Sequence, residues 1–437
     1  MIGNPPYVEA KKLKWIAVKL KHYDVYSGTA DLSVYFIEKG ICLCKERGIL
    51  SYINTNKFFF TEYGKNVREY LLKYQIKGII NCEQVAVFEN TLVSTTIFSI
   101  SIQPIFFDEF VYQKYYQLKH DEFIQKFLID RNNGFSKFKQ SVLDSTGWSF
   151  SDDIENKLKK KIEYQNKLIC EINGIAVYRG VTTGYNPAFI VNETIAKSLI
   201  HGDSKNKEII KKLLQGRNIR MWTYNESNEY LLFTKQGIKI NNYPKIKEHL
   251  NIFYKYLKPR RKGEKSEGRK PGCYKWYEIQ DNTAYYSEFE KSEKIIWGLT
   301  ADKWAFAYDN QKHYLPSNGY ILTSQIIPIK YLLAILNSKL MKYYFKFIGI
   351  MTAGGAYTLK HGTIQELPIK IIQKKDEIIK LVDKILNIKK ESIHSDVSNI
   401  EQQLDTLVYK IYNLTYDEVK VIEPDFHLNK MEYDNLA

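Results

Sequence analysis

The sequence predicts an α/β domain at the amino end, an α+β domain after it and helices at the carboxyl end. Over the first 150 residues, stretches with helical spacing alternate with short apolar runs. From about residue 172 onward, short β-like runs are separated by turns that contain Gly, Asn or Pro. Beyond residue 370, apolar residues repeat at helical spacing. These patterns are typical of part of an α/β sheet, of an α+β or β-rich domain, and of packed helices, respectively.

The elements of the first domain can be assigned in order. Residues Leu32–Lys45 have apolar side chains at helical spacing, Arg47 and Gly48 supply a C-cap, and the apolar run Ile49–Ile53 predicts a strand. The same order recurs as a helix over 67–74, a strand over 76–82 and a β-rich stretch over 95–102.

The chain is too long for one hydrophobic core, since single cores rarely exceed about 250 residues. Between about residues 103 and 153 the sequence becomes aromatic and basic without a clear period. We therefore predict a first, α/β domain over 1–150, a second domain over 151–370 and a helical segment over 371–437. One strong helix is expected over 331–347, and two more over 378–386 and 400–411.

Composition favours a polyanionic partner. The formal net charge is +15, and 34 Tyr and 22 Phe are interleaved with Lys and Arg. Rings stack on bases while cations hold phosphates, so nucleic acid is preferred to an anionic membrane surface. An AT-rich genome, whose codons favour Lys, Asn, Ile and Tyr, would give a similar composition.

The remaining composition argues against several classes of protein. Five Cys without paired CxxC spacing predict neither a disulfide framework nor a structural zinc site, and no metal is expected. There is no apolar run of the ~20 residues needed to span a bilayer and no charged-then-apolar leader, so a cytoplasmic protein without membrane contact is expected.

One motif near the start suggests chemistry, the run Gly3-Asn4-Pro5-Pro6-Tyr7. An amino group on a purine ring is a poor nucleophile, because its lone pair is delocalised into the ring. The Asn4 side-chain oxygen and the Pro5 carbonyl could draw that amino group towards tetrahedral geometry, the two prolines would fix the turn, and Tyr7 would stack on the ring. A simple Asn-Pro turn is the alternative interpretation.

This run resembles the catalytic motif of methyltransferases that modify an exocyclic or amide nitrogen. The segments that follow it, residues 30–39, 48–53 and 56–58, are similar in order and spacing to the corresponding segments of the TaqI-like class of N6-adenine DNA methyltransferases. The resemblance implies part of a class-I methyltransferase sheet, and catalytic roles for Asn4, Pro5, Pro6 and Tyr7.

A second resemblance implies an aromatic partner for Tyr7. The segment Val87–Ser94 is similar to the family segment whose phenylalanine stacks on the opposite face of an adenine extruded from the duplex. Phe88 is the matching residue, so Tyr7 and Phe88 would enclose the base and compensate part of the unstacking. Alternatively, Phe88 is a core residue at a strand end.

Residues from about 175 to 368 resemble the TaqI-like specificity domain. The matching segments are Tyr178–Asn186, Leu213–Ile219, Tyr243-Pro244, Trp276–Glu278, Lys294–Trp297, Leu336–Lys339 and Glu366–Pro368. Such a domain implies double-stranded DNA as the partner, with cations on phosphates and other side chains on base edges. The candidate DNA contacts are Arg179, Arg217, Arg220, Lys258, Arg260, Arg261, Lys262 and Arg269.

Each of these cations could instead be solvated surface. The loop from Lys255 to Gly272 is the preferred candidate, because its charge density suggests no role in folding.

The family resemblance also implies S-adenosylmethionine as the methyl donor, but its glycine-rich motif is missing. It is found neither before the run at Asn4 nor, as in permuted members, near the carboxyl end, where Gly354-Gly355 lacks the required pattern. The strand before Asn4 is reduced to Met1–Gly3, so we expect a sheet truncated at its amino end. A separate N-terminal polypeptide would then be needed for activity. No nuclease motif of the P-D-x(n)-E-x-K kind is found.

The resulting expectation is a site-specific DNA adenine N6-methyltransferase of a restriction-modification or phage-defence system. Two alternatives stay open. One is a non-catalytic DNA-binding specificity subunit, and the other is an enzyme that methylates RNA or a protein glutamine, since NPPY also occurs in those classes.

Overall fold

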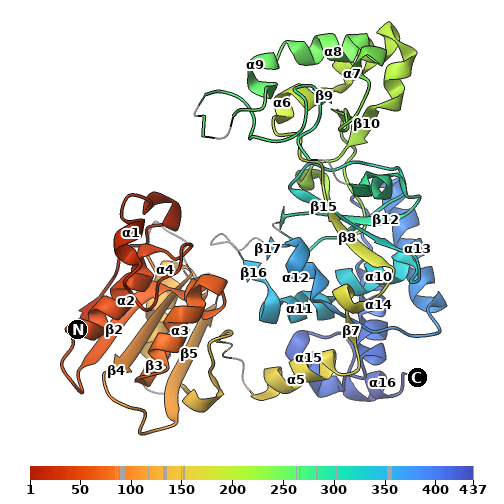
Figure 1. Cartoon of the computed structure of the whole chain (residues 1–437). Helices are drawn as coiled ribbons and strands as arrows, with labels where there is room; N and C mark the ends of the chain where they lie inside the picture. The colour runs from red at the N-terminus through yellow and green to blue at the C-terminus, as the bar shows by residue number, and fades with distance from the viewer. Residues whose placement is uncertain are drawn as a thin grey trace. The chain divides into compact units, whose positions relative to one another are not determined.

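The computed structural model describes the chain except residues 84, 86, 89–93, 117, 131–134, 149, 151–152, 262, 265, 282–283, 302, 352–356 and 437. It divides between Ile154 and Glu155 into two compact units (Figure 1). We call Met1–Ile154 unit 1, and Glu155–Met351 together with 356–437 unit 2.

Unit 1 is built on a mixed sheet with the strand order β1-β2-β4-β3-β5-β6. Strand β1 is parallel to β2, β4 is antiparallel to both β2 and β3, and β5 is parallel to β3. The strands are β1 Ile2–Gly3, β2 Ile49–Thr55, β3 Gln75–Glu83, β4 Thr95–Ser101, β5 Glu109–Tyr116 and β6 Ser136–Lys139. The predicted α/β class and the strands expected from residues 49, 76 and 95 are confirmed.

The helices of unit 1 follow from local signals. Helix α2 (Leu32–Leu43) begins at Asp31, whose side chain accepts a hydrogen bond from the Ser33 backbone N–H at 3.0 Å. Arg47, at φ 60°, provides the left-handed turn after it. The other helical elements are η1 Ala10–Lys12, α1 Ala17–Leu20, η2 Asn56–Phe59, η3 Glu62–Gly64, α3 Lys65–Leu71, α4 His120–Asp130 and η4 Gln140–Val142.

A close fit around the ring of Tyr52 joins β1 to the rest of unit 1. A Cβ placed on Gly3 would lie 2.8 Å from Tyr52 Cε1, and one on Gly40 would lie 2.6 Å from the Tyr52 hydroxyl. That hydroxyl also contacts the Met1 sulfur at 3.2 Å. The ring therefore fits beside the backbones of β1 and α2 only because both positions lack a side chain.

Unit 2 is organised by the sheet β14-β12-β15-β8, which has a hydrophobic core on each face. Its strands are β8 Ile175–Arg179, β12 Lys294–Gly298, β14 Ala307–Asp309 and β15 Gly319–Ser324. In β12, Ile295 and Trp297 belong to one core and Ile296 to the other. Since successive side chains point to opposite faces, both sets are buried and the strand has no polar face.

The first core lies between this sheet, the helix α5 (Asp153–Glu163) and the helices of the carboxyl end. The latter are α10 Ile329–Asn337, α11 Lys339–Ile348, α12 His361–Gln365, α13 Asp376–Glu391, α14 Ser398–Ile411, α15 Tyr416–Ile422 and α16 Lys430–Asp434. Val382 and Leu404 share this core with Ile295. Residues 371–437 are therefore part of unit 2 rather than a separate segment.

The single helix expected over residues 331–347 is wrong, because the structure has two helices there. Ser338 adopts an extended conformation between α10 and α11, and its hydroxyl accepts a hydrogen bond from the Met341 backbone N–H at 3.2 Å. Asp405 accepts a second one from the Lys339 N–H at 2.8 Å. These two acceptors satisfy backbone donors that a continuous helix would have satisfied itself.

The second core lies on the opposite face, under α6 Asn186–Phe189, α7 Glu193–Gly202, α8 Pro244–Asn251 and α9 Tyr254–Leu257 (Figure 1). It includes the small sheet of β9 Ile190–Asn192, β10 Ile210–Leu213 and β11 Glu229–Leu232. The remaining short elements of unit 2 are β7 Lys167–Leu168, η5 Ile169–Glu171, η6 Ser204–Glu208, η7 Gly216–Asn218, η8 Ile240–Asn242, η9 Ala284–Glu290, β13 Thr300–Ala301, β16 Ile350–Met351, β17 Tyr357–Thr358 and β18 Pro368–Ile369.

Arg269 has a structural role in this region. Its side chain is 3% exposed. Its guanidinium donates to the backbone carbonyls of Leu257, Thr183, Glu278, Lys275 and Trp276. Burial lowers the pKa of Arg269 to about 10, which leaves it charged at neutral pH. All five N–H donors are used, so the expectation that Arg269 contacts DNA is corrected here: it ties the end of the basic loop to the protein.

Among the described helices, none is both long enough and apolar enough to cross a bilayer.

The space around Tyr52 predicts the effect of Gly40→Ala. Within a helix this change normally stabilises by up to about 1 kcal/mol, but here the new methyl group would overlap the Tyr52 ring. We expect the free energy of unfolding of unit 1 to fall by about 1 kcal/mol or more in urea titrations followed by circular dichroism. Gly28→Ala is the matched control, because its Cβ would meet no atom closer than 3.9 Å. A gain in stability for Gly40→Ala would contradict the fit described.

The burial of Arg269 predicts a large loss of stability for Arg269→Met. Five carbonyls would lose their donor, and each buried unsatisfied group costs about 1–3 kcal/mol. We expect the free energy of unfolding of unit 2 to fall by about 3 kcal/mol or more. Arg261→Met, at an exposed position of the same loop, should stay within about 0.5 kcal/mol of wild type. Equal effects of the two changes would count against a structural role for Arg269.

Candidate functional site

Asn4 lies at the edge of the unit 1 sheet where β1 and β2 end. It directly follows β1, which pairs in parallel with β2 through Ile2 opposite Ser51. Asn4 is exposed and Pro5 is buried. Within the described part of the chain, neither the side-chain amide of Asn4 nor the backbone carbonyl of Pro5 takes part in a hydrogen bond. Both acceptors predicted from the sequence thus lack a hydrogen-bond partner among the described residues.

The turn that contains Asn4 is fixed at both ends. On one side, β1 is paired with β2. On the other, the Val8 backbone N–H donates to the Pro6 carbonyl at 3.2 Å, and the Val8 carbonyl accepts from the Leu32 N–H at 2.9 Å, at the start of α2. Backbone pairing on both sides limits the movement of Asn4, which favours a defined acceptor geometry.

Tyr7 is tethered to the neighbouring strand. Its hydroxyl donates to the carbonyl of Ile53 in β2 at 3.2 Å. Burial, together with the negative charge of Asp31, raises the pKa of Tyr7 to about 12, so its hydroxyl stays protonated at neutral pH. The side chain is half-buried. This arrangement fits a ring held for stacking better than a group that exchanges protons.

Asn56 is a polar residue at this edge to which the sequence reasoning gave no role. It follows the end of β2 and is 2% exposed. Its side-chain N–H donates to Asn81 Oδ1 at 3.0 Å, whereas its own Oδ1 is buried without a hydrogen-bond partner. A buried unsatisfied acceptor is costly in a protein and often marks a functional site. An Asn immediately after a strand was the available signal.

The predicted aromatic enclosure is only partly described. Phe88 is half-exposed, and residues 84, 86 and 89–93 lie outside the described part of the chain. No ring contact joins Tyr7 and Phe88 among the described residues. The role of Phe88 therefore stays a prediction.

The candidate DNA contacts of unit 2 divide by exposure and by location. Arg179, at the end of β8, is exposed, and its Nε donates to the Ser317 carbonyl at 2.6 Å. Lys258 and Arg261 are exposed in the basic loop, and Arg260 is half-buried there. Lys262 lies outside the described residues. Arg217 and Arg220 are exposed and line a pocket.

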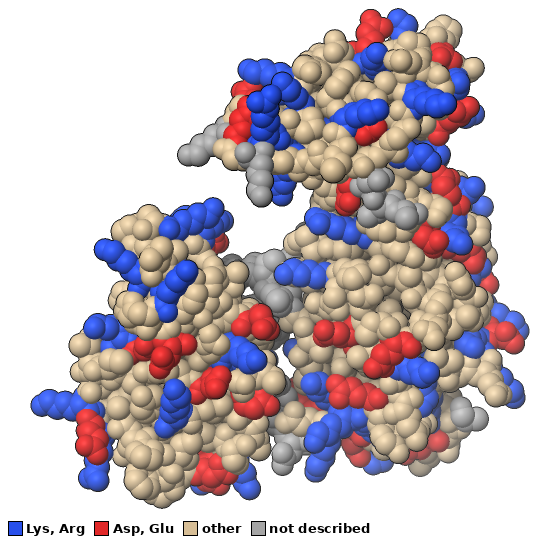
Figure 2. All heavy atoms as spheres, in the orientation of Figure 1, with Lys and Arg blue, Asp and Glu red and all other residues tan. Residues whose placement is uncertain are grey.

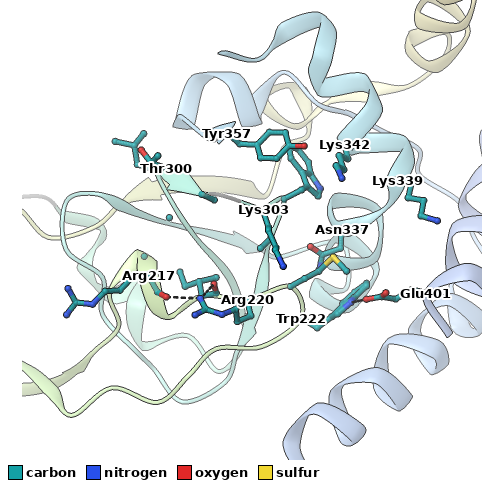
Figure 3. Close-up of a pocket in the computed structure, with 18 of the residues that line it drawn as sticks. Arg217, Arg220, Trp222, Thr300, Lys303, Asn337, Lys339, Lys342, Tyr357 and Glu401 are labelled. Atoms are coloured by element: carbon teal, nitrogen blue, oxygen red, sulfur yellow. Dashed lines mark hydrogen bonds between the residues drawn. The ribbon is translucent and has the colours of Figure 1, made fainter. Parts of the chain in front are cut away.

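That pocket of unit 2 brings together cations that are far apart in the sequence. Its volume is about 1170 Å³. Besides Arg217 and Arg220 it is lined by Lys303, Lys339 and Lys342 (Figure 3). The Arg220 guanidinium donates to the Arg217 carbonyl at 2.7 Å, which holds Arg220 against η7.

Several groups in the pocket are already paired, among them Arg217, which pairs with Glu229 at 3.2 Å. Lys339 bonds to Glu423 at 2.5 Å, and the Trp222 indole N–H donates to Glu401 at 2.6 Å. In the described part of the chain, Lys303 and Lys342 have no ion pair, and both side chains extend into the space between the elements in Figure 3. The sequence analysis named neither of these lysines, because they become neighbours of Arg220 only through the fold.

Two segments of the chain match known protein families. Residues 1–88 match the family described as Eco57I restriction-modification methylase, and they contain Asn4, Tyr7 and Asn56. Residues 211–369 match the TaqI-like C-terminal specificity domain, and they contain Arg217, Arg220 and the basic loop.

Two curated relatives align with nearly the whole chain. The type II restriction enzyme and methyltransferase RM.Eco57I of Escherichia coli is 24% identical over 477 residues, covering 100% of this chain and 45% of the relative. The type II methyltransferase M.BstVI of Geobacillus stearothermophilus is 21% identical over 443 residues, covering 97% of this chain and 74% of the relative. The chain thus spans less than half the length of RM.Eco57I.

The fold is similar to that of a solved structure, the type IIL restriction-modification enzyme MmeI in complex with DNA. The TM-score is 0.63 at 12% sequence identity, and the similarity covers 100% of this chain and 57% of that chain. At this level of identity the likeness concerns the fold alone.

The chain therefore contains an Eco57I methylase segment and a TaqI-like C-terminal specificity domain, and its homologues are type II restriction-modification methyltransferases.

Proposed function

We propose that this chain holds the target adenine and recognises DNA in a site-specific DNA adenine N6-methyltransferase of a restriction-modification or phage-defence system. The observation that carries the proposal is the geometry at Asn4. Two acceptors without a partner among the described residues lie in a turn that is held at both ends by backbone hydrogen bonds, inside the segment that matches the methylase family.

In the proposed reaction, Asn4 and Pro5 act on the amino group of an adenine turned out of the duplex. The Asn4 Oδ1 and the Pro5 carbonyl each accept a hydrogen bond from one N–H of the amino group. These two bonds turn the nitrogen lone pair away from the ring and towards an electrophile. No strong base is needed beforehand, because the methylated amine is cationic and loses its proton readily. The protein's contribution is positioning.

Tyr7 and Phe88 have a stacking role in this proposal. The Tyr7 hydroxyl bond to β2 holds the ring at the edge where Asn4 lies, and base–aromatic stacking offsets part of the cost of unstacking. Phe88 would take the other face of the base. The Asn56 oxygen lies at the same edge, buried and without a hydrogen-bond partner, and this proposal gives it no contact with the base.

Unit 2 supplies DNA recognition in the same proposal. The MmeI structure, whose fold this chain shares, is a complex with DNA. The exposed cations Arg179, Lys258 and Arg261, and the pocket lined by Arg217 and Arg220, provide the positive charge that phosphates require.

The methyltransferase families that the chain matches imply S-adenosylmethionine as the methyl donor. Three glycines on strands or a helix of unit 1 make room for protein atoms: a Cβ on Gly3 or Gly40 would meet Tyr52, and one on Gly78 would meet Val111 at 2.8 Å. Within the described part of unit 1, no turn with several glycines follows a strand. The described residues do not fit the donor, and the role proposed for this chain concerns the methyl acceptor.

The test is the effect of Asn4→Ala on tritium transfer from S-adenosylmethionine to unmethylated plasmid DNA. The assay uses the chain alone and the chain with a polypeptide that supplies the cofactor-binding motif of this class. We expect the variant to lose about 100-fold or more in rate, since one acceptor of the reacting amine is removed. DNA affinity should change less than about 2-fold, because the contact forms only with the extruded base.

Asn251→Ala, at an exposed position on α8, is the control and should match wild type. Full methyl transfer by Asn4→Ala would refute the role of Asn4. Specific DNA binding by wild type without any transfer, under either condition, would favour the non-catalytic specificity subunit.

A further inference from the structure

The segment that follows the Asn4 turn has two faces of opposite character. Leu13 and Leu20 are buried, at 6% and 9% exposure, and belong to the core of unit 1. Between them, Trp15 is 83% exposed and Val18 is 79% exposed. An indole normally buries most of its large apolar surface, so exposure of this extent needs an explanation.

The backbone holds Trp15 in this position by consecutive helical turns. The Leu13 N–H donates to the Ala10 carbonyl at 3.0 Å, the Ile16 N–H to the Leu13 carbonyl at 3.0 Å, and the Lys19 N–H to the Ile16 carbonyl at 2.8 Å. With leucines anchored on either side, the ring is displayed by an ordered segment. Figure 1 shows α1 beyond the edge of the sheet at which β2 ends, the edge that carries Asn4.

The same segment is strongly basic. Five lysines are exposed around Trp15, and the sequence from Ala10 to Tyr23 has no acidic residue. Glu9 pairs with Lys11 at 2.5 Å. The other four, which have no ion pair among the described residues, are Lys12, Lys14, Lys19 and Lys21. Figure 2 shows Lys and Arg side chains on this end of unit 1.

An exposed ring among unpaired cations matches the chemistry of nucleic acid. Bases stack on aromatic side chains, and lysines neutralise phosphates about one base step away. An anionic lipid surface also attracts cations and Trp, but it requires a continuous apolar helix face. Here α1 has only four residues, of which Leu20 is buried in the core and Val18 is exposed, so it is too short to present such a face. The observations therefore favour a nucleic acid.

We propose that residues Ala10–Tyr23 form a second DNA-binding element, in which Trp15 stacks against bases next to the extruded adenine while Lys12, Lys14, Lys19 and Lys21 hold the flanking phosphates. This inference rests on the proposed function, because that function supplies its partner, duplex DNA. It assigns to unit 1 a direct part in DNA binding, in addition to that of the specificity domain. Stacking by Trp15 would help to keep the DNA duplex open where a base has been extruded.

The test compares Trp15→Ala, Trp15→Phe and Phe106→Ala in the full chain, by fluorescence anisotropy with a labelled mixed-sequence duplex. Phe106 is the matched control, because it is an aromatic residue that is 67% exposed and lies beyond the end of β4, at the opposite edge of the sheet. We expect Trp15→Ala to weaken binding about 10-fold or more, Trp15→Phe to retain most of the affinity, and Phe106→Ala to have no effect. The decrease in tryptophan fluorescence on addition of DNA should be smaller for Trp15→Phe than for wild type.

The salt dependence checks the lysines separately. Each phosphate contact contributes about 0.9 to the slope of log affinity against log salt concentration, so Lys14→Gln with Lys19→Gln should lower that slope by about 2. Lys430→Gln, at the carboxyl end, should leave it unchanged. Wild-type affinity and slope in Trp15→Ala and in the double variant would overturn this inference and leave the proposed function intact. Absence of any duplex binding by wild type would overturn both, and binding of anionic phosphatidylserine vesicles in place of DNA would overturn this inference in favour of a membrane.

Discussion

The ring of Tyr52 is the constraint on which the position of Asn4 depends. It occupies space that glycines leave free on β1 and on α2, and its hydroxyl contacts Met1. With only Ile2 and Gly3 in the strand, β1 has few hydrogen bonds of its own. The packing against Tyr52 and the bond from Leu32 to Val8 therefore supply much of what holds the turn. Small residues are required at positions 3 and 40 for a reason of shape, and that shape fixes two acceptors at the edge of the sheet.

In unit 2, the buried central sheet holds the elements that carry the exposed cations. The sheet is buried on both faces, so β12 and β15 cannot shift without disturbing two cores at once. Arg217 and Arg220 follow β10, whereas Lys339 and Lys342 lie on α11. These elements converge on one pocket. Arg269 uses its charge differently: it is buried and joins the basic loop to carbonyls of several segments. Position in the fold, rather than residue type, decides which arginine is available to a ligand.

The sequence predicted helix α2 and strands β2, β3 and β4 of unit 1 because their signals are local: apolar side chains at helical spacing from Leu32, an apolar run from Ile49, and alternation between helix and strand. Strands β5 and β6 lie in the aromatic and basic stretch, where no element was predicted. The sequence also suggested two acceptors at Asn4 and Pro5, and their role stays a prediction. Long-range facts were beyond it. Ser338 ends a helix partly because Asp405, 67 residues later, receives the freed N–H. Arg269 looked like a surface cation because no local pattern shows that the chain folds around it and brings carbonyls from Leu257, Thr183 and the segment 275–278 to its guanidinium. The pocket position of Lys303 and Lys342 and the missing partner of the Asn56 oxygen depend on neighbours that only the fold brings together.

The central claim is that the Asn4 oxygen and the Pro5 carbonyl receive the amino group of an extruded adenine. The most direct measurement is a structure of the chain bound to a duplex selected from random sequence for tight binding. The account predicts one adenine outside the helix, its N6 within about 3 Å of both Asn4 Oδ1 and the Pro5 carbonyl, and its ring against Tyr7. A duplex with every adenine stacked and paired, or Asn4 covered by protein in the complex, would contradict it.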